Sequence, residues 1–174
     1  MKPTFILVLI LLLTACKTMH KGDVGMNMIL PKTAETLEVP EDQQFLFPTP
    51  IIEPILPVYP AALLGSGVQQ IICVEIVIDE NGEVSNAHPL MDLPECPSSD
   101  KPPNPLFTAA AISAVKQWQF AAAAICRFPK TVKKNDDCQG DDVVITSIAI
   151  KLAYTFAFSV KNNRSAVTVR HQNQ

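Results

Sequence analysis

Residues 144–160 read VITSIAIKLAYTFAFSV, and this stretch decides the fold. Its apolar side chains share one parity: Val144, Ile148, Ile150, Leu152, Tyr154, Phe156, Phe158 and Val160. Polar residues alternate with them: Ser147, Lys151, Thr155 and Ser159. Successive side chains of a strand point to opposite faces of a sheet, so a period of two residues predicts one long, half-buried β-strand.

A β-hairpin is predicted upstream of this strand. Its first strand spans residues 67–79 and has one apolar face: Val68, Ile72, Val74, Ile76 and Ile78. Asp79-Glu80-Asn81-Gly82 forms the turn, because Asn-Gly tolerates positive φ. It does not match a calcium loop, whose glycine stands at the sixth position rather than the fourth. Residues 84–90 return as the second strand, which must end at Pro89 or lie at a sheet edge.

An amphipathic helix is predicted between the hairpin and the long strand. It opens at Asn104-Pro105, with Asn as N-cap and Pro at the first helical position. One face of about four turns is apolar: Phe107, Ala111, Ala114, Val115 and Trp118. After the long strand, residues 161–164 are predicted to turn and residues 166–169 to form a short last strand. The order ββαββ predicts an α+β fold, with one helix on an antiparallel sheet of three to four strands.

The first residues have the form of an export signal. Lys2 gives a positive start, and residues 5–13 are an unbroken apolar run, about half the ~20 residues of a membrane-spanning helix. The following Leu13-Thr14-Ala15-Cys16 resembles the lipobox of bacterial lipoproteins. The resemblance implies that residues 1–15 are a signal peptide and that Cys16 carries lipid. Lys17 stands where that family's inner-membrane retention signal has Asp, which implies the outer membrane, facing the periplasm.

The rest of the chain divides into a tether, one domain and a tail. No helical or alternating apolar period persists in residues 16–57, which are therefore predicted to be a lipidated N-terminus and flexible tether. The domain is placed at residues 58–170 and the tail at residues 171–174. A net charge of −3, with no basic stripe, gives nucleic-acid binding no electrostatic support.

Short motifs follow one another in a set order between residues 59 and 169. They are Tyr59-Pro60-Ala61, Gly65 and Gly67, Val74 to Asp79, Gly82 and Val84, Asn104 to Phe107, Ala109-Ala110, and Ala114 to Phe120. No single element is specific, but their order and spacing together resemble the C-terminal domain of TonB-like proteins. Residues 92–103 and 127–142 depart from that pattern as insertions, and each carries a cysteine. The transmembrane helix and long spacer of a true energy transducer are also missing.

The resemblance implies a function in binding. In that family the domain binds a short peptide of an outer-membrane transporter, which adds as a strand to the sheet edge. The corresponding peptide-binding edge strand is Tyr154, Thr155, Phe156, Ala157, Phe158, Ser159 and Val160. We therefore expect a lipoprotein that binds a transporter peptide, or another envelope protein, in TonB-dependent transport. The alternative is a structural envelope lipoprotein that uses the domain for assembly or scaffolding, without energy transduction.

Four cysteines remain after Cys16, and in an oxidising periplasm an even number favours two disulfides among three connectivities. Cys126–Cys138 is favoured because it closes an inserted loop, and Cys73–Cys96 then follows by elimination. A zinc site is the rival, but no Cys-x-x-Cys occurs and His88 is the only histidine within the domain.

Catalysis finds little support in the sequence. Gly65-Ser66-Gly67 lacks the Gly-x-Ser-x-Gly form of a nucleophile elbow, and no base can be assigned beside a serine. We expect no enzyme activity, no cofactor, no metal and no small-molecule substrate.

Overall fold

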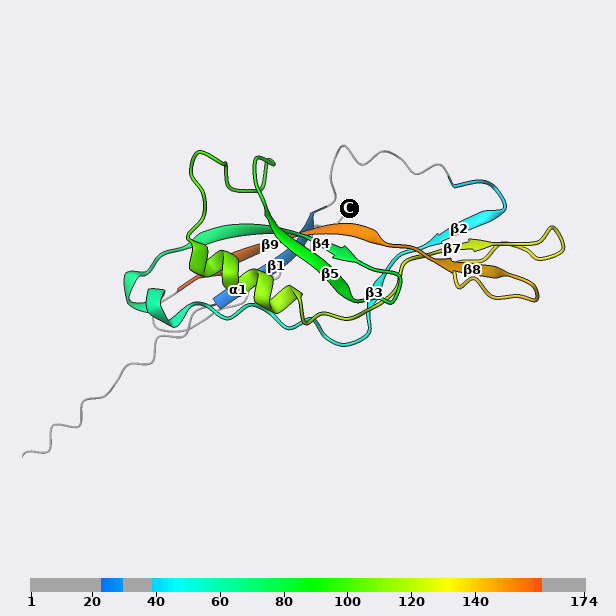
Figure 1. Cartoon of the computed structure of the whole chain (residues 1–174), viewed down its shortest axis with the longest axis horizontal. Coiled ribbons are helices and arrows are strands. Elements are labelled where there is room, and N and C mark those ends of the chain that lie inside the picture. The colour runs from blue at the N-terminus through cyan, green and yellow to red at the C-terminus, as the bar shows by residue number, and fades with distance from the viewer. Residues whose placement is uncertain (1–22, 30–38, 161–174) are drawn as a thin grey trace, which may run out of the picture.

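Four antiparallel strands form the main sheet, in the order β1-β9-β4-β5. They are β1 (Asp23–Ile29), β4 (Gln70–Ile78), β5 (Val84–Leu90) and β9 (Ile150–Ser159). The computed structural model describes residues 23–29 and 39–160. Helix α1 (Pro105–Val115) covers one face of this sheet, packed against β4 and β5 (Figure 1). The fold is therefore α+β, as the sequence predicts.

The β4–β5 hairpin forms around the expected turn. Asp79 Oδ1 accepts hydrogen bonds from the backbone N–H groups of Asn81 and Glu83, at 2.9 and 3.0 Å. Gly82 has a φ of 83°, and a Cβ there would collide with the carbonyl oxygen of Phe120, so only glycine fits. Strand β5 has the predicted bounds, and its Pro89 lies on an edge strand, as proline requires.

Strand β4 begins later than predicted, at Gln70 rather than residue 67. The chain before it forms a short 3-10 helix, η1 (Ala61–Ser66), which ends at Gly67 with a φ of 64°. Val68 is consequently outside the strand and 39% exposed, whereas the other four residues of the predicted face are fully buried.

Helix α1 starts as expected, because Asn104 Oδ1 accepts a hydrogen bond from the Leu106 N–H at 2.9 Å. It ends at Val115, about one turn sooner than the sequence pattern suggests. Its inward side chains Phe107, Ala111, Ala114 and Val115 are all buried. Trp118 is 3% exposed and belongs to the same core although it follows the helix.

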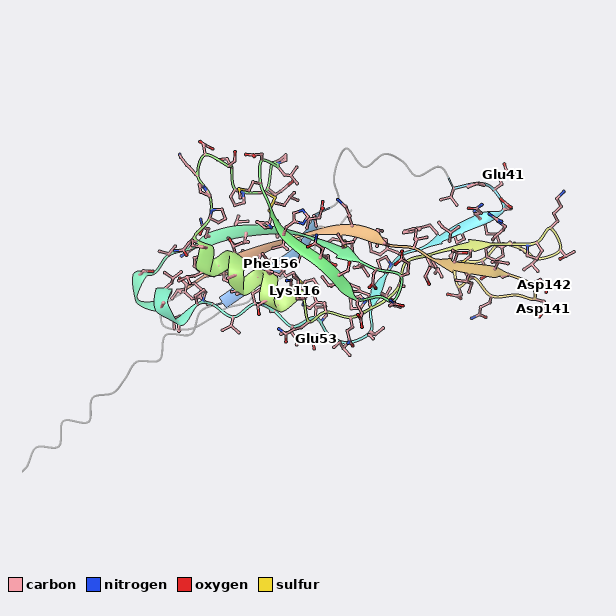
Figure 2. The ribbon with its side chains drawn as sticks, in the orientation of Figure 1. Glu41, Glu53, Lys116, Asp141, Asp142 and Phe156 are labelled. Carbon is pink, nitrogen blue, oxygen red and sulfur yellow. A yellow bond between two sulfur atoms is a disulfide. The ribbon has the colours of Figure 1, made fainter. Side chains whose placement is uncertain are left out.

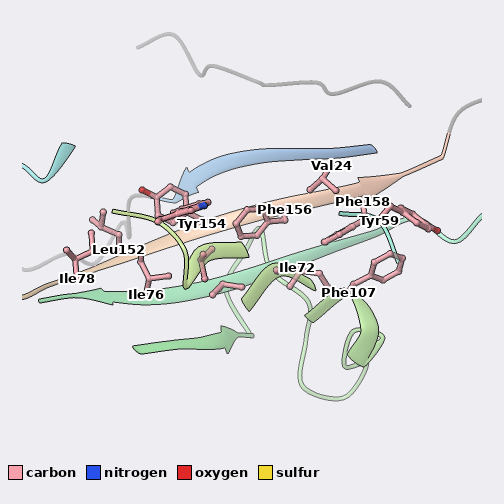
Figure 3. Packing of buried hydrophobic residues seen from close by; sticks show 14 of the residues in the cluster. Val24, Tyr59, Ile72, Ile76, Ile78, Phe107, Leu152, Tyr154, Phe156 and Phe158 are labelled. Atoms are coloured by element: carbon pink, nitrogen blue, oxygen red, sulfur yellow. The ribbon is translucent and has the colours of Figure 1, made fainter. Parts of the chain in front are cut away.

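The core lies between α1 and the inner face of β9 and β4. Phe107 and Phe158 meet with ring centroids 4.7 Å apart, and Tyr59 contacts Phe107 edge-on at 5.1 Å. Phe156 and Ile72 are wholly buried in the middle of the cluster (Figure 3). Aromatic and β-branched side chains therefore dominate the packing, although only 6% of the residues of the chain are aromatic.

The long strand predicted at residues 144–160 is in fact two strands in different sheets. Its first part is β8 (Val144–Ser147), which forms a three-stranded sheet with β2 (Gln43–Leu46) and β7 (Ala124–Arg127), in the order β2-β7-β8. This arm projects from one end of the main sheet (Figure 1). No described helix covers it, so Val144 is 58% exposed although it shares the parity of the core residues. Figure 2 shows Asp141 and Asp142 near its far end.

Residues 39–60 pack on the domain, which differs from the tether expected over residues 16–57. Besides β2, they contain β3 (Thr49–Pro50), which pairs with β6 (Phe120–Ala121). Beyond β3, Trp118 Nε1 donates a hydrogen bond to the carbonyl oxygen of Ile55 at 2.8 Å. Hydrogen bonds spaced along an irregular segment leave no apolar period, so the only sequence signal for this docking is the apolar runs Phe45-Leu46-Phe47 and Ile51-Ile52, which fit docking on the domain or on a partner as well as a linker without a role.

Candidate peptide-binding strand

The predicted peptide-binding residues Tyr154 to Ser159 all lie on β9, and Val160 follows directly. Tyr154, Phe156 and Phe158 face the core and are 6% exposed or less, whereas Ala157 lies exposed on the opposite face. The alternation expected from the sequence therefore holds over this part of the strand. It sets the inner side chains for packing, whereas the opposite face is only partly exposed, since Ala153 on that face is buried.

Strand β9 is not an edge strand, contrary to what the resemblance implies. It lies between β4 and β1, and both pairings are antiparallel. The β1 pairing runs over seven residues, from Asp23 opposite Ser159 to Ile29 opposite Ala153. The side of β9 that would accept a peptide is thus covered by a segment of the same chain.

The packing of β1 explains why this segment forms a strand. Val24, Met26 and Met28 lie opposite Phe158, Phe156 and Tyr154, in that order. Val24 is 3% exposed, and both methionines pack against the same core. The sequence signal for this strand was the alternation of these three apolar residues. The signal is weak because the residues that alternate with them are Asp, Gly and Asn, which strands disfavour.

The outer face of β9 and its neighbours carries charge and a disulfide. Glu75 of β4 lies between two basic side chains, with Oε1 3.1 Å from Lys151 Nζ and 3.3 Å from His88 Nε2. Such half-exposed ion pairs contribute little to stability. Beside them, Cys73 is bonded to Cys96, which fastens the loop after β5 to this face.

The second disulfide stabilises the arm. Cys126 of β7 is bonded to Cys138, with their Cα atoms 5.8 Å apart. Both sulfurs belong to a small core with Phe128, onto which Leu46, Val132 and Val143 pack. Both pairings, Cys126–Cys138 and Cys73–Cys96, are the ones expected from the sequence.

Two tyrosines of this core have a raised pKa. Burial raises the pKa of Tyr154 to about 12, and its ring meets Trp118 edge-on at 5.0 Å. Burial also raises the pKa of Tyr59, whose hydroxyl donates a hydrogen bond to the carbonyl oxygen of Val68 at 2.6 Å. The folded protein thus favours the neutral form of both rings.

We expect the free energy of unfolding to fall as pH rises above about 10. The unfolded chain ionises its tyrosines near the ordinary pKa of 10.0, whereas Tyr154 in the folded protein does so only near 12. Stability from this group is fully present below pH 10 and is lost by roughly 2 kcal/mol at pH 12. Urea unfolding at several alkaline pH values measures the slope. A Tyr154→Phe variant should show a shallower one, and an unchanged slope would contradict this assignment.

Neither a metal-ligand group nor a membrane-spanning helix occurs in the part of the chain that the structure describes. Within residues 23–29 and 39–160, no group of three or more His, Cys, Asp or Glu residues could hold a metal ion. No helix of the same residues is long and apolar enough to cross a membrane. Cys16, the signal peptide, the last strand expected at residues 166–169 and the tail lie outside the described residues.

No protein-family model matches this chain, and no curated protein matches it in sequence. The resemblance to TonB-like domains therefore rests on the motifs between Tyr59 and Phe120 and on their spacing. The structure itself defines a disulfide-bonded α+β domain. In it, the side of β9 that does not pair with β4 pairs with β1, a strand from the N-terminal part of the same chain.

Proposed function

We propose that the protein is a lipoprotein of the bacterial envelope, anchored through Cys16 in the outer membrane and facing the periplasm. Its TonB-like domain binds an extended segment of a protein partner, which pairs with β9. The partner is the peptide of an outer-membrane transporter, and the setting is TonB-dependent uptake.

The observation that carries this proposal is the pairing of β1 with β9. A strand that lies far from β9 in the sequence adds to its side in a continuous seven-residue register. In strand addition, backbone hydrogen bonds supply affinity and alternate side chains supply selectivity. The β9 side has both, since its backbone pairs with β1 and its inner aromatic residues contact the apolar residues of β1.

The positions of the TonB-like motif residues agree with the proposal. Tyr59 fastens the entry to the domain, Gly82 makes the hairpin turn and Trp118 packs on Tyr154 of the binding strand. Each of these three motif residues therefore has a structural role that depends on its residue type. Disulfides form and persist in oxidising compartments, so two of them favour an extracytoplasmic location, in agreement with the lipobox.

Site-specific photocrosslinking in intact envelopes tests the partner. A photoreactive amino acid at Ala157, exposed on β9, should give adducts with the periplasm-facing segment of a transporter. The same probe at Ser85, exposed on β5, is the matched control and should not give them.

The alternative function, a structural lipoprotein used for assembly or scaffolding, predicts different adducts from the same experiment. Assembly or scaffolding proteins captured at Ala157, with no transporter among them, would favour that function. Identical adducts from Ala157 and Ser85 would remove β9 as the binding strand.

A further inference from the structure

The segment that covers β9 is also the segment that connects the domain to Cys16. Only six residues separate Cys16 from Asp23, the first residue of β1. At about 3.3–3.6 Å per residue, this connection spans at most about 25 Å. If β1 leaves β9, the connection extends to β2, and 26 residues separate Cys16 from Gln43. Its limit is then about 90 Å.

We propose that β1 is a built-in, displaceable ligand of β9, and that a partner strand which replaces it releases the domain to reach further from the membrane. This inference rests on the proposed lipid anchor and on the proposed strand binding at β9. Beyond the proposed function, it identifies β1 as the segment that competes with the partner, predicts the sequence pattern of the partner strand, and predicts a change in how far the domain reaches from the membrane.

The two neighbours of β9 differ in how firmly they are held. Strand β4 pairs with β9 over nine residues and has four wholly buried β-branched residues on its inner face. Strand β1 pairs over seven residues, and of its inner residues only Val24 is buried, while Met26 and Met28 are half-buried. Its remaining positions include Asp23, Gly25 and Asn27, residue types that strands disfavour. Strand β1 is therefore the neighbour that a competing strand can replace.

The register of β1 describes the segment that would replace it. Three apolar residues at alternating positions must face Phe158, Phe156 and Tyr154, running antiparallel to β9. Residues of high strand propensity at the intervening positions would make such a segment a better strand than β1 itself. A shift by one residue would turn its apolar face away from the core, so the pattern is specific in register.

Attachment in the same chain gives β1 an advantage over any free peptide. A short connection holds a segment at an effective concentration on the order of millimolar. The apparent affinity for a competitor falls by the fraction of molecules in which β9 is uncovered. Weakening β1 should therefore strengthen peptide binding, and fastening β1 should prevent it.

Two engineered disulfides distinguish a β1 that is fastened to β9 from a β1 that is free to leave it. Both include a cysteine at position 157. Gly25 and Ile71 are its register partners on β1 and β4. Gly25→Cys with Ala157→Cys locks β1 in place, whereas Ile71→Cys with Ala157→Cys is the matched control that leaves β1 free. A third variant, Val24→Asp, places a carboxylate at a buried position of β1 and favours its release. Mass spectrometry verifies the pairing of all cysteines before use.

The binding probe is a fluorescent peptide, TVTMTMI, added to the full lipidated chain in proteoliposomes. A peptide with the same composition but its apolar residues moved by one position is the control. Compared with the wild type, Val24→Asp should bind at least tenfold more tightly and the β1 lock at least tenfold more weakly. The Ile71 lock, which carries the same Ala157→Cys substitution, should bind at least tenfold more tightly than the β1 lock.

Energy transfer between a donor at Ser99, exposed on the domain, and an acceptor dye in the bilayer measures the reach. Peptide should lower the transfer efficiency of the wild type and leave that of the β1 lock unchanged. Equal peptide binding by the wild type, the lock and Val24→Asp would overturn the inference and would also remove β9 as the binding strand, whereas weaker binding by the lock with an unchanged transfer efficiency would overturn the change in reach alone. Absence of binding in every variant would remove the proposed capture as well.

Discussion

Removing both disulfides is expected to lower the free energy of unfolding by about 6 kcal/mol. The bonds close loops with sequence separations of 23 and 12 residues. Loop-closure entropy assigns about 3.5 kcal/mol to Cys73–Cys96 and about 3 kcal/mol to Cys126–Cys138. A typical domain has a net stability of only about 5–15 kcal/mol, so the reduced chain should be partly or wholly unfolded at 37 °C.

Alanine variants of each pair, measured by urea unfolding, separate the two contributions. The bonds lie in different sheets, so their effects should add. Loss of Cys126–Cys138 should act mainly on the arm, because both cysteines belong to its small buried cluster with Phe128. The double variant in reducing buffer is the control for unrelated effects of the reductant. An unfolding midpoint of the native chain that reduction does not move would refute the prediction.

Replacing Phe156 by alanine is expected to cost about 3–5 kcal/mol. The ring is completely buried at the centre of the core, with its centroid 6.0 Å from that of Trp118. It also lies opposite Met26 of β1 and Ile72 of β4, so the cavity would open between all three neighbours. Because β1 has few other contacts, we expect hydrogen exchange to accelerate in β1 more than in β4.

Phe47→Ala is the matched control for this variant. Phe47 is 43% exposed, and truncation at such a position should change stability by about 0.5 kcal/mol or less. Equal effects of the two substitutions in urea unfolding would mean that Phe156 is not the centre of the core.

The hairpin, the helix and the inner part of β9 could be predicted because their signals are local. Strong alternation, an Asn-Gly turn and an Asn-Pro helix start are each contained within a few residues. The division of residues 144–160 between two sheets could not be predicted, because Val144 has the same residue type and the same parity as the core residues. What differs is the absence of a covering helix over the arm in the described residues, and that depends on the tertiary arrangement.

The pairing of β1 with β9 could not be predicted from local sequence patterns for a related reason. Residues 23–29 and 153–159 pair across more than a hundred positions of sequence. Neither stretch contains a feature that identifies the other as its partner, since backbone pairing requires only compatible apolar faces. The two disulfides could be assigned because four cysteines allow only three connectivities.

The antiparallel register of β1 on β9 also has a mechanical meaning. With the proposed lipid anchor at Cys16, tension would enter β1 at Asp23, which pairs with Ser159 at the C-terminal end of β9. Pulled across the strands, the seven pairs would open one after another from Asp23, like a zipper. Pulled along them, all seven would be sheared together, because the hydrogen bonds of an antiparallel pair lie perpendicular to the strands. The direction of a pull on the domain thus decides how much force β1 withstands.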